Sequence, residues 1–169
     1  DGLVYCPGSI NLRPFKGLKP EAFEADLQIN FISLVKVIQS VLPNLLASEQ
    51  ASIVAFSSVA ATMGMPFHTS VAASKGAIEG FAKALAAEYA PKIRVNVIAP
   101  SLTDTPLADK FLNNETKQEK SAERHPLKRF GKPEDSAQMA TFLLSDKSSW
   151  ISGQIFHVDG GMSTLLING

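Results

Sequence analysis

Short runs of β-branched and aliphatic residues alternate along the chain with longer segments in which apolar residues recur every three or four positions. The short runs lie around Val4 and at residues 52–56, 93–98 and 154–158. Each has the length of a strand, and Pro or Gly follows several of them. This alternation is typical of βαβ units and predicts an α/β protein with a parallel sheet.

Three longer segments have the period of an amphipathic helix. The first begins at Pro20, whose fixed φ suits a first helical position, and extends to about residue 46. Its predicted buried stripe comprises Phe23, Leu27, Phe31, Leu34, Ile38, Val41 and Leu45. The second, at about residues 69–89, is rich in Ala and Gly, small residues that let another helix approach closely. The third occupies residues 133–144.

Composition and charge narrow the classes of function. Lys plus Arg and Asp plus Glu number 16 each, so no net basic charge indicates a nucleic-acid partner. Cys6 is the only cysteine, which excludes an internal disulfide and favours a reducing cytoplasm. We expect no apolar run long enough to cross a bilayer and no signal peptide. These features predict a cytoplasmic protein without a nucleic-acid or membrane partner. They are consistent with a small-molecule substrate and no metal.

The segment from residue 51 to residue 77 carries the most specific pattern. It predicts a strand, a loop and a helix of small residues, with Ser58 and Lys75 seventeen positions apart. This resembles the active-site segment of the short-chain dehydrogenase/reductase family, in which Tyr follows the Ser by thirteen positions and Lys follows the Tyr by four. The thirteenth residue after Ser58 is Val71. The family's proton donor is therefore replaced by an aliphatic side chain.

The resemblance covers about residues 1–163 and is most specific near the C-terminus. The runs RFGKPED at 129–135, FLLSD at 142–146, ISGQ at 151–154 and VDGG at 158–161 follow the family's order. The run RVNVIAP at 94–100, with Thr105, resembles the strand and turn that hold the nicotinamide end of NAD(P). The family's fold is a doubly wound, Rossmann-like parallel sheet with helices on both faces.

The chain has no initiator Met and begins inside a strand-like run at Asp1. We therefore expect residues 1–169 to be a single domain that forms the C-terminal portion of a Rossmann-like fold. The family's Gly-rich turn, which cradles the pyrophosphate, would precede Asp1. A complete site for NAD or NADP is expected in the full-length protein alone.

The resemblance implies a role for several residues. In the family a Tyr phenol protonates the substrate oxygen while the nicotinamide supplies hydride. Ser58 would polarise the carbonyl, Lys75 would hold the nicotinamide ribose, and Asn30 would anchor a water next to the lysine. The cofactor-binding set implied is Gly8, Lys75, Pro100, Ser101, Leu102 and Thr105. Val71 can do no acid chemistry, so His68, with a side chain that titrates near neutral pH, is a candidate replacement donor.

Each of these residues also has a plain structural interpretation. Ser58 would satisfy backbone groups at a strand end, and Lys75 would be a solvated helix lysine. Asn30 would be a polar residue at the edge of the apolar stripe. Thr105 would cap a turn or helix, and His68 would be a pocket-wall or surface residue.

Two further departures from the family's pattern lie beside the expected cofactor site. Tyr5-Cys6-Pro7-Gly8 stands where the family has Asn-Asn-Ala-Gly, and Ser101 stands where the family has Gly. Tyr5 is predicted to pack rather than to donate a proton. Cys6 is predicted to be a buried, small apolar side chain. Ser101 places a side chain where the family brings bare backbone to the cofactor.

Three functions stay open. The first is an NAD(P)(H)-dependent oxidoreductase whose proton comes from His68, water or the substrate. The second is a homologue that binds nucleotide or ligand without transferring hydride, as a regulatory or structural subunit. The third is a truncated product without activity. The resemblance also implies a homodimer or homotetramer built through the helices at about 20–46 and 69–89.

Overall fold

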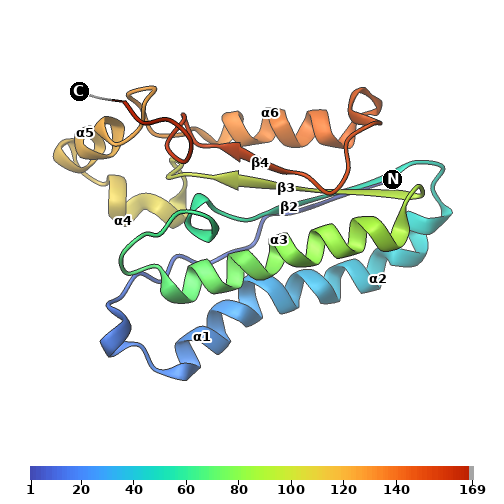
Figure 1. Ribbon diagram of the computed structural model, residues 1–169, viewed down its shortest axis with the longest axis horizontal. Coiled ribbons are helices and arrows are strands. Elements are labelled where there is room, and N and C mark those ends of the chain that lie inside the picture. The colour runs from blue at the N-terminus through green and yellow to red at the C-terminus, as the bar shows by residue number, and fades with distance from the viewer. Residues whose placement is uncertain (168–169) are drawn as a thin grey trace.

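The structure is a computed structural model that describes residues 1–167. Four strands form one parallel sheet in the order β1-β2-β3-β4 (Figure 1). They are β1 (Gly2–Tyr5), β2 (Ala51–Phe56), β3 (Ile93–Pro100) and β4 (Ile155–Val158). All three strand pairs are parallel, which confirms the predicted sheet. The assignment of residues 1–169 to one domain remains a prediction.

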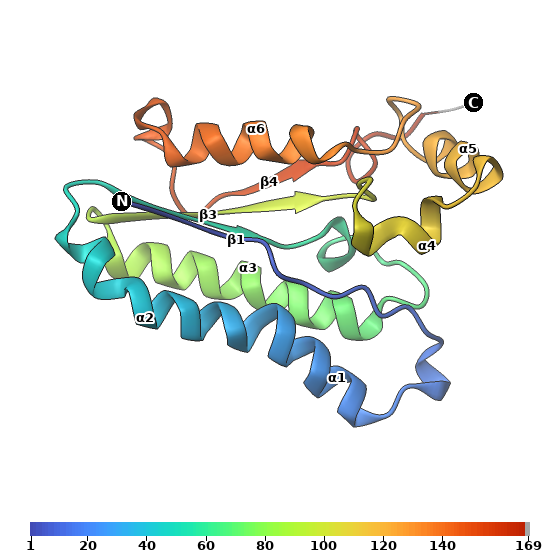
Figure 2. The ribbon, with the colours of Figure 1, turned by 180° about the vertical axis from the view of Figure 1, so that it is seen from behind.

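Helices cover both faces of the sheet, as the alternation of elements predicts. α1 (Pro20–Leu27), α2 (Ser33–Ala47) and α3 (Thr69–Tyr89) lie on one face, and α6 (Pro133–Leu144) lies on the other (Figure 2). α4 (Asp109–Leu112) and α5 (Glu115–Glu123) lie beyond the carboxyl end of β3. Short 3₁₀ turns occupy Phe15–Gly17, Val59–Ala61, Pro106–Ala108 and Asp146–Ser148.

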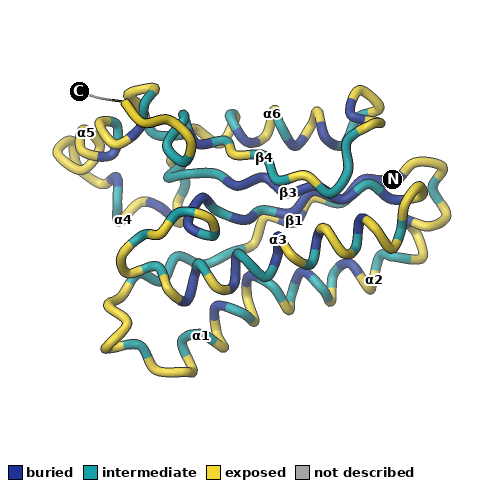
Figure 3. Tube along the Cα trace, in the orientation of Figure 1, coloured by how far each residue is buried: buried dark blue, intermediate teal, exposed yellow. Residues whose placement is uncertain are grey.

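The core consists of two apolar layers, one on each face of the sheet. β2 and β3 are buried along nearly their whole length, as Figure 3 shows. The larger layer joins the sheet to α2 and α3, where Leu34, Ile38 and Leu45 of the predicted stripe are buried. The smaller layer joins Val54 and Ile98 to α6. Burial on both faces accounts for the nearly continuous apolar character of the two central strands.

The first long helix is interrupted where the sequence predicts continuity. Residues Gln28–Ile32 form a π turn between α1 and α2. Ser33 Oγ donates to the Gln28 carbonyl at 2.7 Å, and Tyr5 Oη donates to the Ile29 carbonyl at 3.1 Å. A π turn inserts one residue into the helix and is often found at a functional site. Here it places Asn30, which is completely buried, on the face toward the carboxyl end of β1.

The expectation that no apolar run is long enough to cross a bilayer is wrong by length and composition. The helical segment Pro20–Ala47 has 28 residues and a mean hydropathy of 1.5 over its most apolar window. Core helices of soluble proteins meet the same criterion. Its apolar stripe packs here against α3 and the sheet.

The phenol of Tyr5 generates a prediction about the π turn. Tyr5→Phe keeps the ring, which is 6% exposed, and removes the hydroxyl that donates to the Ile29 carbonyl. We expect the free energy of unfolding, measured by urea denaturation, to fall by about 1 kcal/mol. Tyr89→Phe is the matched control, because the Tyr89 phenol lies beside Glu88 near the surface. Equal losses from both variants would contradict a stabilising role of the Tyr5 hydrogen bond.

Candidate active site

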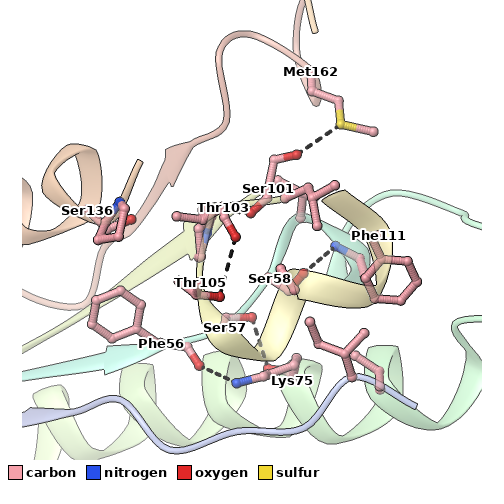
Figure 4. A pocket seen from close by; sticks show the side chains of 18 of the residues that line it. Phe56, Ser57, Ser58, Lys75, Ser101, Thr103, Thr105, Phe111, Ser136 and Met162 are labelled. Carbon is pink, nitrogen blue, oxygen red and sulfur yellow. Dashed lines mark hydrogen bonds between the residues drawn. The ribbon is translucent and has the colours of Figure 1, made fainter. Parts of the chain in front are cut away.

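The carboxyl ends of the strands open into a cavity of about 930 Å³. Most of the predicted site residues line it: Ser58, His68, Val71, Lys75, Pro100, Ser101, Leu102 and Thr105. Gly8 and Asn30 lie outside the lining, with Gly8 next to the Lys75 side chain. Figure 4 shows Ser58, Lys75, Ser101 and Thr105 drawn together from different elements. Topology therefore gathers residues that the sequence separates widely.

Lys75 lies on α3 with its ammonium in the cavity wall. Nζ donates to the Phe56 carbonyl at 2.9 Å, and the residue is 7% exposed (Figure 4). Burial lowers the pKa of Lys75 to about 8, and the Cys6 thiolate works in the opposite direction. This environment differs from that of a solvated helix lysine. The side chain is held at the end of β2 and is not free to extend into water.

Ser58 directly follows the loop residue Ser57 at the end of β2. Its Oγ accepts a hydrogen bond from the Ala60 N–H at 3.2 Å and so caps the Val59–Ala61 turn. This is the structural contact expected of a serine at a strand end. The residue also lines the cavity, and no protein acceptor within residues 1–167 takes its O–H, which can therefore donate to a ligand or to water.

Val71 lies one helical turn before Lys75 on α3 and is 4% exposed. It lines the cavity with an aliphatic surface. The Val71 side chain has no polar atom. Its backbone carbonyl accepts a hydrogen bond from Ser74 Oγ at 3.0 Å. Position 71 therefore offers no proton to a bound substrate.

Asn30 joins the loop after β1 to α3. Its Oδ1 accepts from the Ser9 amide at 3.0 Å, and its Nδ2 donates to Ser9 Oγ at 3.0 Å and to Ser74 Oγ at 2.9 Å. These contacts fix the Asn30 side chain between the loop after β1 and α3, and its role as a water anchor stays a prediction. Gly8 packs so closely that an added Cβ would lie 3.1 Å from Lys75 Nζ and 3.2 Å from Asn30 Oδ1.

His68 and Cys6 also reach the cavity wall. His68 precedes α3, and its Nδ1 is 2.7 Å from the Pro66 carbonyl. Because a carbonyl can accept but not donate, this contact places the proton on Nδ1 and leaves Nε2 for other partners. Cys6 is exposed, which corrects the prediction of a buried thiol. Partial desolvation raises the pKa of the Cys6 thiol, while the Lys75 ammonium lowers it.

The turn after β3 forms the opposite wall. Thr103 Oγ1 donates to the Ser101 carbonyl at 3.1 Å, and Thr105 Oγ1 is 3.4 Å from the Thr103 carbonyl. Gly131 packs against this turn so closely that a Cβ there would lie 2.9 Å from Thr103 Oγ1. Thr105 precedes the Pro106–Ala108 turn, but its side chain makes no capping hydrogen bond there.

Sequence reasoning missed three polar residues of this region. Ser9 and Ser74 are the partners of Asn30, and His125 lies 2.6 Å from Ser101 Oγ through its Nε2. None of the three belongs to a motif that marks it. Their contacts join residues 21, 44 and 24 positions apart, which periodicity does not reveal.

The cavity has the donor set that the sugar end of a dinucleotide requires. Lys75 offers an ammonium, and the lack of a side chain at Gly8 leaves room for its Nζ. The Leu102 and Thr103 amides donate to no protein acceptor within residues 1–167. Over the same residues, no group of three His, Cys, Asp or Glu side chains is arranged to hold a metal. The residues present therefore fit NAD(P) better than a metal ion.

Comparisons with known proteins find a matching family model and similar proteins. A family model described as enoyl-(acyl carrier protein) reductase matches residues 1–163. The 3-oxoacyl-[acyl-carrier-protein] reductase FabG of Thermotoga maritima is 40% identical over 146 residues, which cover 86% of this chain and 58% of that protein. This chain thus spans little more than half the length of that relative.

Two other comparisons bear on the site. A Xanthobacter autotrophicus protein named inactive 2-(S)-hydroxypropyl-CoM dehydrogenase 2 is 33% identical over 169 residues, covering 97% of this chain and 74% of that protein. A Burkholderia cenocepacia gluconate 5-dehydrogenase, solved in complex with NADP and tartrate, superposes with a TM-score of 0.91 at 27% identity. That match covers 98% of this chain and 66% of the solved chain.

Burial of Lys75 predicts a specific dependence of stability on pH. Between about pH 8 and pH 10.5 the unfolded chain keeps this proton while the folded protein loses it. The free energy of unfolding should therefore rise with pH, by up to about 1.4 kcal/mol per pH unit, relative to Lys75→Met. Below about pH 8 both states are protonated, so the difference between the two proteins should be constant.

Urea denaturation of both proteins from pH 7 to pH 10.5 checks this expectation. The subtraction removes the titration of the other lysines and the tyrosines, which the two proteins share. Parallel curves across the whole range would show that the Lys75 ammonium is solvated.

Proposed function

Because the chain belongs to the short-chain dehydrogenase/reductase family, we propose that the whole protein transfers hydride between NAD(P)(H) and a carbonyl or alcohol substrate. The observation that carries the proposal is the convergence of Ser58 and Lys75 on one cavity. The solved relative from Burkholderia cenocepacia binds NADP. The reducing cytoplasm expected from the single Cys6 suits a dinucleotide-dependent reaction.

Each residue of the proposed site has a part in this chemistry. NAD(P)(H), when bound, supplies or accepts the hydride at its nicotinamide. Lys75 donates hydrogen bonds to ribose hydroxyls, and its position at the Phe56 carbonyl fixes where the ribose lies. Ser58 donates its O–H to the substrate oxygen as negative charge grows there. Gly8, Pro100, Ser101, Leu102 and Thr105 form the remaining cofactor contacts in this proposal.

The proton that Val71 cannot supply has to come from elsewhere. His68 is the candidate on the protein, because its Nε2 is free of the Pro66 contact and the residue lines the cavity. Water and the substrate are the other sources. In this proposal Asn30 acts indirectly: its contacts with Ser9 and Ser74 hold the loop after β1 against α3.

The alternative function is a nucleotide- or ligand-binding subunit without hydride transfer. Val71 supports it, because the side chain that delivers the proton in the family is absent at a position that still faces the cavity. A relative with 33% identity is named an inactive dehydrogenase. In this alternative Lys75 and Gly8 would still bind nucleotide.

We propose self-association as a homodimer or homotetramer through α3 and the helical segment of α1 and α2. Gly76 and Gly80 lie one turn apart on α3, and a Cβ at either would meet nothing within 4 Å. The open, small-residue surface allows a second helix to approach closely. Ile29 and Ile32 expose 44% and 36% of their surface on the neighbouring segment. These apolar residues would be covered by a two-fold related copy.

Replacement of Val71 tests the oxidoreductase against the binding protein. In the full-length protein, Val71→Tyr should raise turnover of a reactive carbonyl compound on the order of 10²-fold or more, because a positioned general acid commonly accelerates a reaction by this factor. Lys75 is placed one turn away to favour ionisation of the new phenol. Val71→Phe is the control, since it adds the ring without the hydroxyl and should raise nothing.

Cofactor titration completes this test. NAD(P)H affinity, measured by fluorescence, should be similar in the wild type and both Val71 variants and weaker in Lys75→Met. His68→Ala lowers native turnover if His68 supplies the proton. Absence of NAD(P)(H) binding at millimolar concentration would refute the oxidoreductase proposal, and binding without turnover in any variant would favour the subunit.

Light scattering tests the proposed helix interface. The wild type should have the mass of a dimer or tetramer at micromolar concentration, and Gly80→Phe should shift it toward the monomer because the ring blocks close helix approach. Gly64→Phe is the control, since Gly64 has equally open surroundings but lies in the loop before α3, outside the proposed helix interface. A monomeric wild type would contradict the proposal.

A further inference from the structure

A second pair of reactive side chains lies on the cavity wall formed after β3. Ser101 Oγ and His125 Nε2 are 2.6 Å apart, and His125 Nδ1 is 2.7 Å from the Ser121 carbonyl. His125 is 3% exposed. The carbonyl of Ser121 can only accept, so Nδ1 carries the proton and Nε2 presents a lone pair to the Ser101 hydroxyl. The imidazole is thus oriented to take a proton from Ser101.

Ser101 remains accessible despite this contact. It lines the cavity of about 930 Å³ and also a neighbouring cavity of about 320 Å³, as does His125. Ser101 Oγ is also within donating distance of Met162 Sδ, at 3.2 Å, so Met162 and His125 Nε2 are alternative acceptors for its one proton. The side chain points away from Ser58 and Lys75 (Figure 4). The pair therefore lies at the junction of the two cavities and is separate from the contacts that hold Lys75.

Two backbone amides directly follow Ser101 along the chain. Those of Leu102 and Thr103 donate to no acceptor in the part of the chain that the structure describes, residues 1–167. Amides that directly follow a nucleophilic serine can stabilise an oxyanion formed at that serine. Apolar residues near it also line the cavity, among them Leu102, Phe111 and Met162. This surface suits an acyl chain.

We propose that Ser101 is the nucleophile, and His125 the general base, of an acyl-transfer site that cleaves esters or thioesters of apolar acyl groups. Ser101 Oγ forms a bond to the acyl carbon while its proton passes to His125 Nε2. The bond from carbon to the alcohol or thiol breaks, and the leaving group takes that proton. Water, activated by the same imidazole, then releases the carboxylic acid and restores the serine.

The Ser121 carbonyl takes the place of the carboxylate found in a complete triad. It fixes the tautomer of His125 but adds no full negative charge beside the imidazolium. The site is accordingly a dyad, and its rate should be modest. A purely structural pair would hold the segment after α5 against the turn after β3 without making Ser101 reactive. Reactivity of the hydroxyl distinguishes the two roles.

The experiment measures nucleophilicity directly. The purified full-length protein is treated with a biotinylated fluorophosphonate, and the labelled residue is identified by mass spectrometry. In parallel, hydrolysis of p-nitrophenyl butyrate is followed. We expect one adduct, on Ser101, and we expect His125→Gln to slow labelling and hydrolysis on the order of 10²-fold or more. Added imidazole should restore part of the rate of His125→Ala.

His157→Gln is the matched control. His157 lines the smaller cavity but bonds to Thr62 at 3.3 Å and should leave both rates unchanged. Circular dichroism establishes that each variant is folded. Labelling of Ser101 in the wild type can be measured even if a variant fails to fold. An adduct elsewhere, no adduct, or labelling of Ser101 that His125→Gln does not slow would overturn the proposal. Because Ser101 is also a proposed cofactor contact, labelling and hydrolysis are measured without added dinucleotide, and either outcome leaves the proposed hydride transfer to its own test.

Discussion

Parallel pairing of the strands is the constraint on which the arrangement of this protein depends. Because β1 to β4 run in one direction, their carboxyl ends meet at one edge of the sheet. The segments after Phe56 and Pro100 therefore line one cavity, although they lie more than 40 positions apart. Helices on both faces bury the sheet and leave this edge as the place where polar side chains meet a ligand.

The desolvation cost of that arrangement falls mainly on the Lys75 ammonium. An ammonium that is 7% exposed has lost most of its hydration, and one carbonyl bond to Phe56 replaces only part of it. A bound sugar would provide further acceptors at this point. Asn30, equally buried, has no such need, because Ser9 and Ser74 satisfy its amide. The Lys75 ammonium therefore keeps donor capacity for a ligand, as do the Leu102 and Thr103 amides on the opposite wall.

Sequence patterns predicted the helices and strands, in which apolar residues recur with a regular period. α3 extends from Thr69 to Tyr89 as its period indicates, and the four strands lie within a few residues of their predicted bounds. The π turn escaped prediction because one inserted residue hardly changes an apolar stripe. The partners of Asn30 and Ser101 escaped because each contact joins residues of different segments, which the period of a single segment does not reveal. The resemblance identified Ser58 and Lys75 as site residues. For Ser101 it implied only a position where the family's backbone approaches the cofactor.

Val71 and Ser101 are two departures from the family's pattern on the walls of one cavity, and their chemical consequences are opposite. Val71 removes an acid from the helix side, next to the lysine that would tune it. Ser101 adds a hydroxyl on the strand side, and His125 supplies a base at 2.6 Å. The scaffold does not depend on either residue type, because strand direction and apolar burial fix the cavity. A cavity that persists in this way can lose one reaction and still offer the geometry for another.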